Sequence, residues 1–64
     1  MLVLAIDTAT KIASVSLYDD KAGILGEINL YVKVNHSNII MTAVDNLFKM
    51  TKLSIDDVDR VAVT

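Results

Sequence analysis

The sequence predicts an α/β domain in which a three-stranded antiparallel meander is followed by one helix and by a fourth strand parallel to the first. A continuous apolar run at positions 2–6 and two later stretches that alternate apolar and polar residues, the last ending at position 34, are typical of strands. The period becomes helical between positions 39 and 48, and a last apolar run follows at 61–64. A right-handed crossover through the helix places the last strand beside the first, so we expect the sheet order 3-2-1-4.

The first two strands are predicted at Leu2–Ile6 and Ile12–Tyr18. The first is a continuous apolar run, which is typical of a strand buried on both faces. The polar segment Asp7–Lys11 between them is short enough to form a hairpin turn. The second strand nearly alternates, and its residues on one face are Ala13, Val15 and Leu17.

The third strand is predicted from Ile24 to Val34, after a turn at Asp19–Gly23 that combines aspartates with glycine. Alternate residues of this strand are apolar, so we expect one face to be buried and the other to face water. Charges on the water-facing side are typical of an edge strand. The face expected to be buried comprises Ile24, Gly26, Ile28, Leu30, Val32 and Val34.

The helix is predicted to run for about four turns after a polar lead in which Asn35 or Ser37 caps its start. Ser54 is expected to open a second, single helical turn. Val61–Thr64 is then predicted to be a further buried strand. The apolar stripe of the long helix consists of Ile39, Ile40, Ala43, Val44, Leu47 and Phe48.

Composition limits the function classes that fit this chain. It has 64 residues, 53% of them apolar, and no cysteine, so it has neither a disulfide framework nor a thiolate metal site. Its net charge of −2 gives no electrostatic basis for nucleic-acid binding.

With no signal peptide and no apolar run near the ~20 residues of a membrane span, we expect a cytoplasmic protein. Because the last apolar strand needs covering, we expect residues 1–64 to begin a longer domain.

Three segments of the sequence resemble the amino-terminal end of one protein family. They are LAIDTAT followed by SVSLY, then NHSNIIMTAVDNLF, and finally LSIDDVDRVAVT. In this order they are similar to the TsaB (YeaZ) family, an accessory subunit of the bacterial machinery that makes N6-threonylcarbamoyladenosine in tRNA. The resemblance implies an actin-like ATPase superfold with ribonuclease-H-like lobes, of which this chain supplies a half-lobe. Asn38 departs from the acidic residue usual in the family. A ferredoxin-like fold or a simple α+β sandwich is the structural alternative.

The resemblance implies a function that is not catalytic. In that family the actin-like paralogue TsaD transfers the threonylcarbamoyl group, and TsaB pairs with it through amino-terminal lobes or with a second copy of itself. The ATPase TsaE is a further partner, tRNA is reached only through the complex, and no membrane is involved. The resemblance implies no cofactor of the chain's own and leaves ATP and magnesium to the complex. The family's old glycoprotease label finds no support, since the single histidine, His36, has no catalytic partner pattern.

The loop after the first strand supports a second hypothesis, from a different class. Asp7, Thr8 and Thr10 place a carboxylate and two hydroxyls directly after a buried strand, as an actin-like ATPase or a sugar or acetate kinase does to hold phosphate and its metal ion. Alternatively, Asp7 accepts hydrogen bonds from its own hairpin turn. Ala9 disfavours the nucleotide interpretation, because phosphate loops usually have glycine where amides approach the ligand.

The helix is the predicted partner interface. Ile39, Ile40 and Met41 place three bulky apolar residues in a row, so one of them must point away from the sheet. We predict an interface that comprises His36, Ile39, Ile40, Met41, Ala43 and Leu47, with core packing as the alternative for the apolar positions. The acidic residues Asp56, Asp57 and Asp59 lack the spacing and glycine of a calcium loop, so we interpret them as a solvated face and a helix start.

Overall fold

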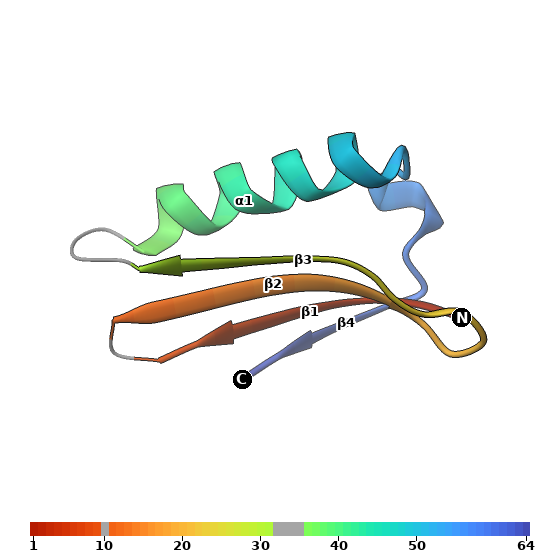
Figure 1. The fold of residues 1–64 in the computed structure, drawn as a ribbon, viewed down its shortest axis with the longest axis horizontal. Coiled ribbons are helices and arrows are strands. Elements are labelled where there is room, and N and C mark those ends of the chain that lie inside the picture. The colour runs from red at the N-terminus through yellow and green to blue at the C-terminus, as the bar shows by residue number, and fades with distance from the viewer. Residues whose placement is uncertain (10, 32–35) are drawn as a thin grey trace.

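The chain folds into two layers, a four-stranded sheet and one long helix (Figure 1). The computed structural model describes residues 1–9, 11–31 and 36–64, and of His36 and Ser37 it describes the backbone only. The sheet order is β3-β2-β1-β4, β4 is parallel to β1 and the other pairs are antiparallel, so the predicted α/β topology is confirmed. The elements are β1 (Leu2–Thr8), β2 (Ile12–Asp19), β3 (Gly23–Tyr31), α1 (His36–Thr51), the 3₁₀ helix η1 (Ile55–Asp57) and β4 (Arg60–Val63).

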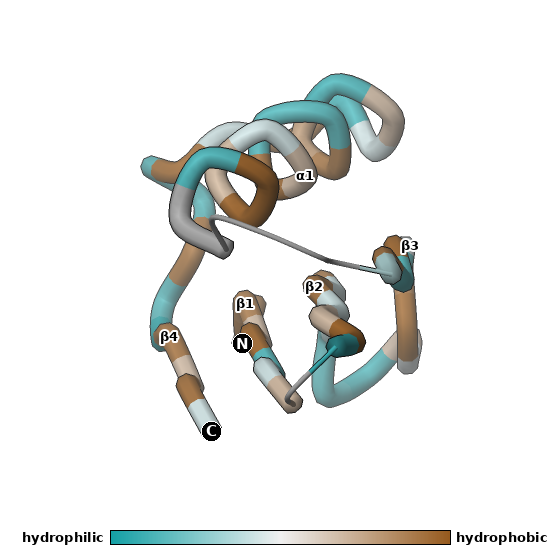
Figure 2. Tube along the Cα trace, turned by 90° about the vertical axis from the view of Figure 1, so that its left-hand side faces the viewer, coloured by the Kyte–Doolittle hydropathy of each residue, from teal (hydrophilic) through white to brown (hydrophobic). Residues whose placement is uncertain are grey.

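The helix covers one face of the sheet, and no described element covers the other (Figure 2). Leu2 and Leu4 of β1 point toward the helix and are buried, whereas Val3 and Ala5 on the opposite face are only half-buried. The prediction that the first strand is buried on both faces is therefore wrong for this chain. A continuous apolar run permits a strand to be buried on both faces, but the single helix layer of this structure covers only one face of the described sheet.

The core lies between α1 and the sheet, where buried side chains of β1 and β2 meet those of α1 and partly buried side chains of β3 pack against them. Helix and sheet approach each other closely at Gly26 of β3. A Cβ atom there would lie 2.9 Å from Leu47 Cδ1 and 3.0 Å from Thr51 Cγ2, so only glycine fits without a shift. The buried core comprises Leu2, Leu4, Val15, Leu17, Ala43, Val44 and Leu47, so it contains part of the predicted stripe of the second strand and part of the predicted stripe of the helix.

A β-bulge in β3 changes the predicted faces of that strand. Leu17 pairs with Gly26, but the next residue, Tyr18, pairs with Ile24, so Leu25 is an extra residue on β3. The extra residue reverses the alternation, and Ile24 lies on the uncovered face with 63% of its surface exposed. The prediction that Ile24 faces the core is therefore wrong. The predicted continuation of this strand over 32–34 lies outside the described residues.

Local hydrogen bonds explain where α1 ends and η1 begins. Lys52 adopts a left-handed φ of 60°, and the Leu53 N–H donates to the Phe48 carbonyl at 3.2 Å, as at other helix ends with this conformation. The Ser54 N–H then donates to the Asp57 carboxylate at 2.9 Å, the reciprocal half of a capping box. The second, single helical turn is therefore confirmed, whereas the proposed caps Asn35 and Ser37 lie outside the described side chains.

Strand β4 is at the edge of the sheet and is exposed along its whole length. Its valines pair with β1 residues that face the helix layer, since Val61 lies beside Leu4 and Val63 beside Ile6. Yet 52% of Val61 and 67% of Val63 is exposed, because α1 packs over β2 and β3 rather than over this edge. The prediction of a buried last strand is wrong for the described chain.

Candidate functional site

The loop predicted to bind phosphate lies where two parallel strands, β1 and β4, end side by side. The Thr64 hydroxyl, one residue beyond β4, donates to Asp7 Oδ1 at 2.9 Å, and the Thr64 N–H donates to the Ile6 carbonyl at 2.9 Å. The Thr8 N–H and Oγ1 both donate to the Thr64 carbonyl, at 3.3 and 3.4 Å. Asp7, Thr8 and Thr64 therefore form one exposed cluster of oxygen atoms at the carboxyl end of parallel strands, where ligands often bind in α/β proteins.

Two amides of this loop, those of Thr8 and Ala9, make hydrogen bonds within the protein. The Thr8 N–H donates to Thr64 and the Ala9 N–H donates to the Ile12 carbonyl at 2.8 Å, so neither points freely outward as a phosphate cradle requires. Among the described residues, the side chain of Asp7 accepts a hydrogen bond from Thr64, just beyond the neighbouring strand, and not from its own turn. Thr10, the third predicted loop residue, lies outside the described residues. The loop thus offers a carboxylate and hydroxyls, but the amides of Thr8 and Ala9 are occupied.

A second candidate site is a groove of about 260 Å³ between α1 and β3. Its floor is apolar, and its rim on the helix carries uncharged polar side chains spaced four residues apart. One of these, the Thr42 hydroxyl, donates to the Asn38 carbonyl at 2.9 Å, so its proton is used within the helix. The groove is lined by Ile28, Leu30, Asn38, Ile39, Thr42, Ala43 and Asn46.

The three consecutive apolar residues of α1 point in different directions. Because each helical residue turns by about 100°, Ile39 and Met41 lie on opposite sides of Ile40. Ile39 lines the groove toward β3, Ile40 is half-buried and packs against the core, and Met41 is 66% exposed. The prediction that one of the three points away from the sheet is confirmed for Met41.

The other predicted interface residues have different surroundings. Leu47 has no exposed surface and Ala43 has 4%, so both pack in the core, and only Ala43 also reaches the groove. The side chain of His36 lies outside the described side chains. Among the predicted positions described by the structure, Ile39 and Met41 therefore offer the most accessible contacts on the two sides of α1.

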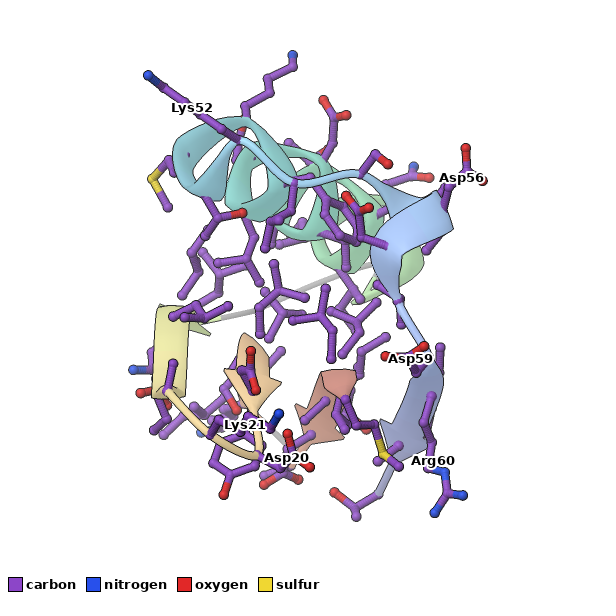
Figure 3. All side chains as sticks on the ribbon, turned by 90° about the vertical axis from the view of Figure 1, so that its right-hand side faces the viewer. Asp20, Lys21, Lys52, Asp56, Asp59 and Arg60 are labelled. Carbon is purple, nitrogen blue, oxygen red and sulfur yellow. The ribbon has the colours of Figure 1, made fainter. Side chains whose placement is uncertain are left out.

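Two of the three acidic residues near β4 make hydrogen bonds within the chain, and Figure 3 shows where Asp56 and Asp59 lie. Asp59 Oδ2 accepts the Leu2 N–H at 2.8 Å, while the Asp59 N–H donates to the Leu2 carbonyl at 2.8 Å. Asp57 caps η1, and Asp56 is exposed. Across residues 1–9, 11–31 and 36–64, no group of three or more potential ligands is arranged to hold a metal ion.

Sequence reasoning missed two parts of these sites. The sequence pattern places Thr64 in a strand and not with the Asp7 loop, and no local motif predicts a contact between residues 57 positions apart. The polar rim of the groove has a sequence signal, because Asn38, Thr42 and Asn46 recur at the four-residue spacing of one helix face. That spacing shows a shared face, but not that β3 lies beside it.

Comparisons with known proteins add no assignment. Neither the models of known protein families nor the curated proteins contain a match to this chain. Within the part of the chain that the structure describes, no helix is long and apolar enough to cross a membrane. What is established is a small α/β domain with a mixed sheet in the order 3-2-1-4.

Proposed function

We propose that the chain is a non-catalytic scaffold subunit that binds a partner protein along the groove between α1 and β3. The observation that carries the proposal is the surface of this groove. Ile28, Leu30 and Ile39 are only partly covered, and the helix side of the rim is polar without charge. Apolar centres with few charges and a polar rim are characteristic of protein interfaces.

The shape of the groove suits a helical partner segment. It runs beside a helix, and an amphipathic helix laid next to α1 would place its apolar side chains on Ile39 and the two β3 residues. Asn38 and Asn46 at the rim would then make hydrogen bonds to the polar side of the incoming helix. This is the helix-in-groove mode of recognition.

The sequence resemblance to the TsaB family supports a specific partner. That resemblance implies pairing with the catalytic paralogue TsaD, with a second copy as the alternative, for threonylcarbamoyl transfer to tRNA adenosine. In this proposal no residue of the chain acts in catalysis, and ATP and magnesium are held by the complex. The contribution of this chain is to bind and orient the paralogue.

The test is a binding measurement between this chain and the catalytic paralogue, by light scattering after gel filtration and by calorimetry. We expect Ile39→Glu to weaken the complex at least tenfold, since it buries a charge in an apolar groove. Met41→Glu, on the opposite side of α1, is the matched control and should change the affinity less than threefold. Ile40→Asp is less suitable because Ile40 packs against the core. Circular dichroism checks that each variant is folded.

Two results would contradict this proposal. A chain that remains free in the presence of the paralogue has no such scaffold role, and an effect confined to Met41→Glu would place the interface on the other side of α1. Binding of ATP with magnesium to the chain alone, lost on Asp7→Asn, would favour the ATPase or kinase hypothesis instead. The exposed Asp7 carboxylate at the ends of two parallel strands is the observation in favour of that alternative.

A further inference from the structure

The apolar pattern of β4 is compatible with more than one register on β1. Val61 and Val63 are two residues apart, and β1 has apolar residues at the same spacing on the face toward α1, namely Leu2, Leu4 and Ile6. A shift of β4 by two residues would keep every side chain on its face, because side chains alternate with a period of two. Apolar patterning alone therefore does not select the observed pairs.

A reciprocal pair of hydrogen bonds at the start of β4 is compatible with one register only. The Asp59 N–H donates to the Leu2 carbonyl at 2.8 Å, and the Leu2 N–H donates to Asp59 Oδ2 at 2.8 Å. Both bonds join the same two residues, and an ionised carboxylate is a stronger acceptor than a neutral group. The bond to the carboxylate is part-buried, where a hydrogen bond is electrostatically stronger than in water.

The segment before β4 holds Asp59 from the other side. The Val58 N–H donates to the Ile55 carbonyl at 3.1 Å, and the Val58 side chain packs against the core. Figure 3 shows Asp59 where the chain passes from η1 into β4. Asp59 is therefore held between η1 and Leu2, and β4 starts from this fixed point.

We propose that Asp59 selects the register of β4 on β1 and thereby positions Thr64 against Asp7 at the far end of the strand. In the observed register Val63 pairs with Ile6, so Thr64 comes beside Asp7 and its hydroxyl donates to Asp7 Oδ1 at 2.9 Å. A shift by two residues would displace Thr64 by about 7 Å along β1, which is too far for this bond. The oxygen cluster at the carboxyl ends of β1 and β4 thus depends on a residue at the opposite end of β4.

The contacts of Thr64 follow the register rather than select it. The bond from the Thr64 hydroxyl to Asp7 is exposed, and the bonds from the Thr8 N–H and Oγ1 to the Thr64 carbonyl are 3.3 and 3.4 Å long. Long or exposed hydrogen bonds contribute less to stability than the short, part-buried bond of Asp59. Asp59 acts on the cluster through the strand, so it is a positioning residue.

Asp59→Ala tests the proposal, and nuclear Overhauser contacts between β1 and β4 report the register directly. In the variant, the contact between Val61 and Leu4 should weaken, and contacts of Val61 with the β1 apolar residues two positions away should appear. Hydrogen exchange of the Thr8 N–H should become about tenfold faster, because its acceptor is displaced. Exchange of the amides that join β2 to β3 is the internal reference, since a general loss of stability would accelerate it equally.

Three matched variants separate the positioning role from a general loss of charge or contact. Asp59→Asn keeps an oxygen acceptor, so it should preserve the Overhauser contacts and change the exchange of the Thr8 N–H by less than about threefold. Asp56→Ala also removes a carboxylate, from an exposed position on η1, and should have no effect on either measurement. Thr64→Val removes the hydroxyl at the far end of the strand and should leave the pairs between β1 and β4 unchanged.

Three outcomes would overturn the proposal. They are a folded Asp59→Ala variant that keeps the observed pairs, an Asp59→Asn variant as disturbed as Asp59→Ala, and a shifted register in Thr64→Val. If Asp59→Ala does not fold, Asp59→Glu is used, since it keeps the charge and moves the carboxylate by one methylene. It should shift the contacts in the same direction to a smaller extent, and unchanged contacts would overturn the proposal. The groove is lined by residues of α1 and β3, so this inference can fail while the proposed scaffold role stands.

Discussion

Strands β2 and β4 contain the same type of residue on the same face of one sheet, yet they differ in burial. Val15 in β2 is 1% exposed, and Val63 in β4 is 67% exposed. The difference lies in what covers them, because α1 packs over β2 and β3 and leaves the β4 edge open. Apolar alternation therefore identifies the residues that are able to be buried, while the position of the helix determines which of them are.

The matched substitutions Val15→Ala and Val63→Ala give the largest difference expected from this comparison. Removing two methyl groups from Val15 loses their burial and leaves a cavity, which should lower the free energy of unfolding by about 2–3 kcal/mol. Val63→Ala should change the unfolding free energy of the monomer by less than about 0.5 kcal/mol. Urea denaturation at low protein concentration measures both. Equal losses would show that β4 is covered in solution.

Gly26→Ala tests the close approach between helix and sheet at β3. The new methyl group would lie 2.9 Å from Leu47 Cδ1, so either α1 moves or Leu47 leaves its rotamer, at a cost of about 1–2 kcal/mol. Thr51→Ser should recover part of this loss, since it removes Cγ2 and retains the hydroxyl that donates to the Leu47 carbonyl at 2.9 Å. A neutral Gly26→Ala would mean that the helix packs more loosely than described.

Hydrogen bonds rather than burial hold β4 at its amino-terminal end, and Asp59→Ala measures this. The substitution leaves the part-buried Leu2 N–H without its carboxylate acceptor at 2.8 Å, which should cost about 1 kcal/mol of stability. The control is Asp56→Ala, because Asp56 is exposed on η1 and should be neutral within about 0.5 kcal/mol. If the two variants were equally stable in urea, the Asp59 contact would have no role in positioning β4.

The order of elements was predictable because it depends on periodicity and on turn residues. Both are local features that can be read from neighbouring positions in the sequence. The helix between two apolar runs, and the turn that ends at Gly23 with a φ of 86°, are such local features. The bulge at Leu25 was not predictable, since Ile24 fits the core pattern as well as Ile28 does. Its position depends on the register with β2, which is a non-local property.

The candidate sites follow the same division between local and non-local information. The carboxylate and threonine after the first strand are readable in the sequence, and the structure places both at the end of β1. The partner of Asp7 is Thr64, which is brought there only by the crossover to β4. The apolar run from Ile39 to Met41 predicted a contact surface, but the groove beside Ile39 exists because β3 lies next to it. The sequence therefore identified the candidate site residues but not the residues that lie beside them.

The smallest expected effect concerns the exposed ion pair at the opposite end of β1. The Met1 ammonium donates to Asp20 Oδ1 at 2.8 Å, and this hydrogen bond raises the amine pKa above 8.0 and lowers the Asp20 pKa below 3.8. Because the carboxyl pKa is lower in the folded chain than in the unfolded one, the pair stabilises the fold above the unfolded carboxyl pKa, and this stabilisation is lost as the pH falls. Because the amine pKa is raised, the pair also stabilises the fold below pH 8.0, and this stabilisation is lost as the pH rises. The pair should therefore contribute between about pH 4 and pH 8.

Asp20→Asn is the substitution that tests this pair, and the amine pKa is a more direct measure than stability because both groups are exposed. Titration of the Met1 amine by nuclear magnetic resonance should show its pKa falling toward 8.0 in the variant. Lys21→Gln, which changes the net charge in the opposite direction in the same turn, should leave that pKa raised. An unchanged amine pKa in Asp20→Asn would mean that the ion pair does not form in solution. The contact between Asp20 and Met1 would then be the backbone hydrogen bond from the Asp20 N–H to the Met1 carbonyl.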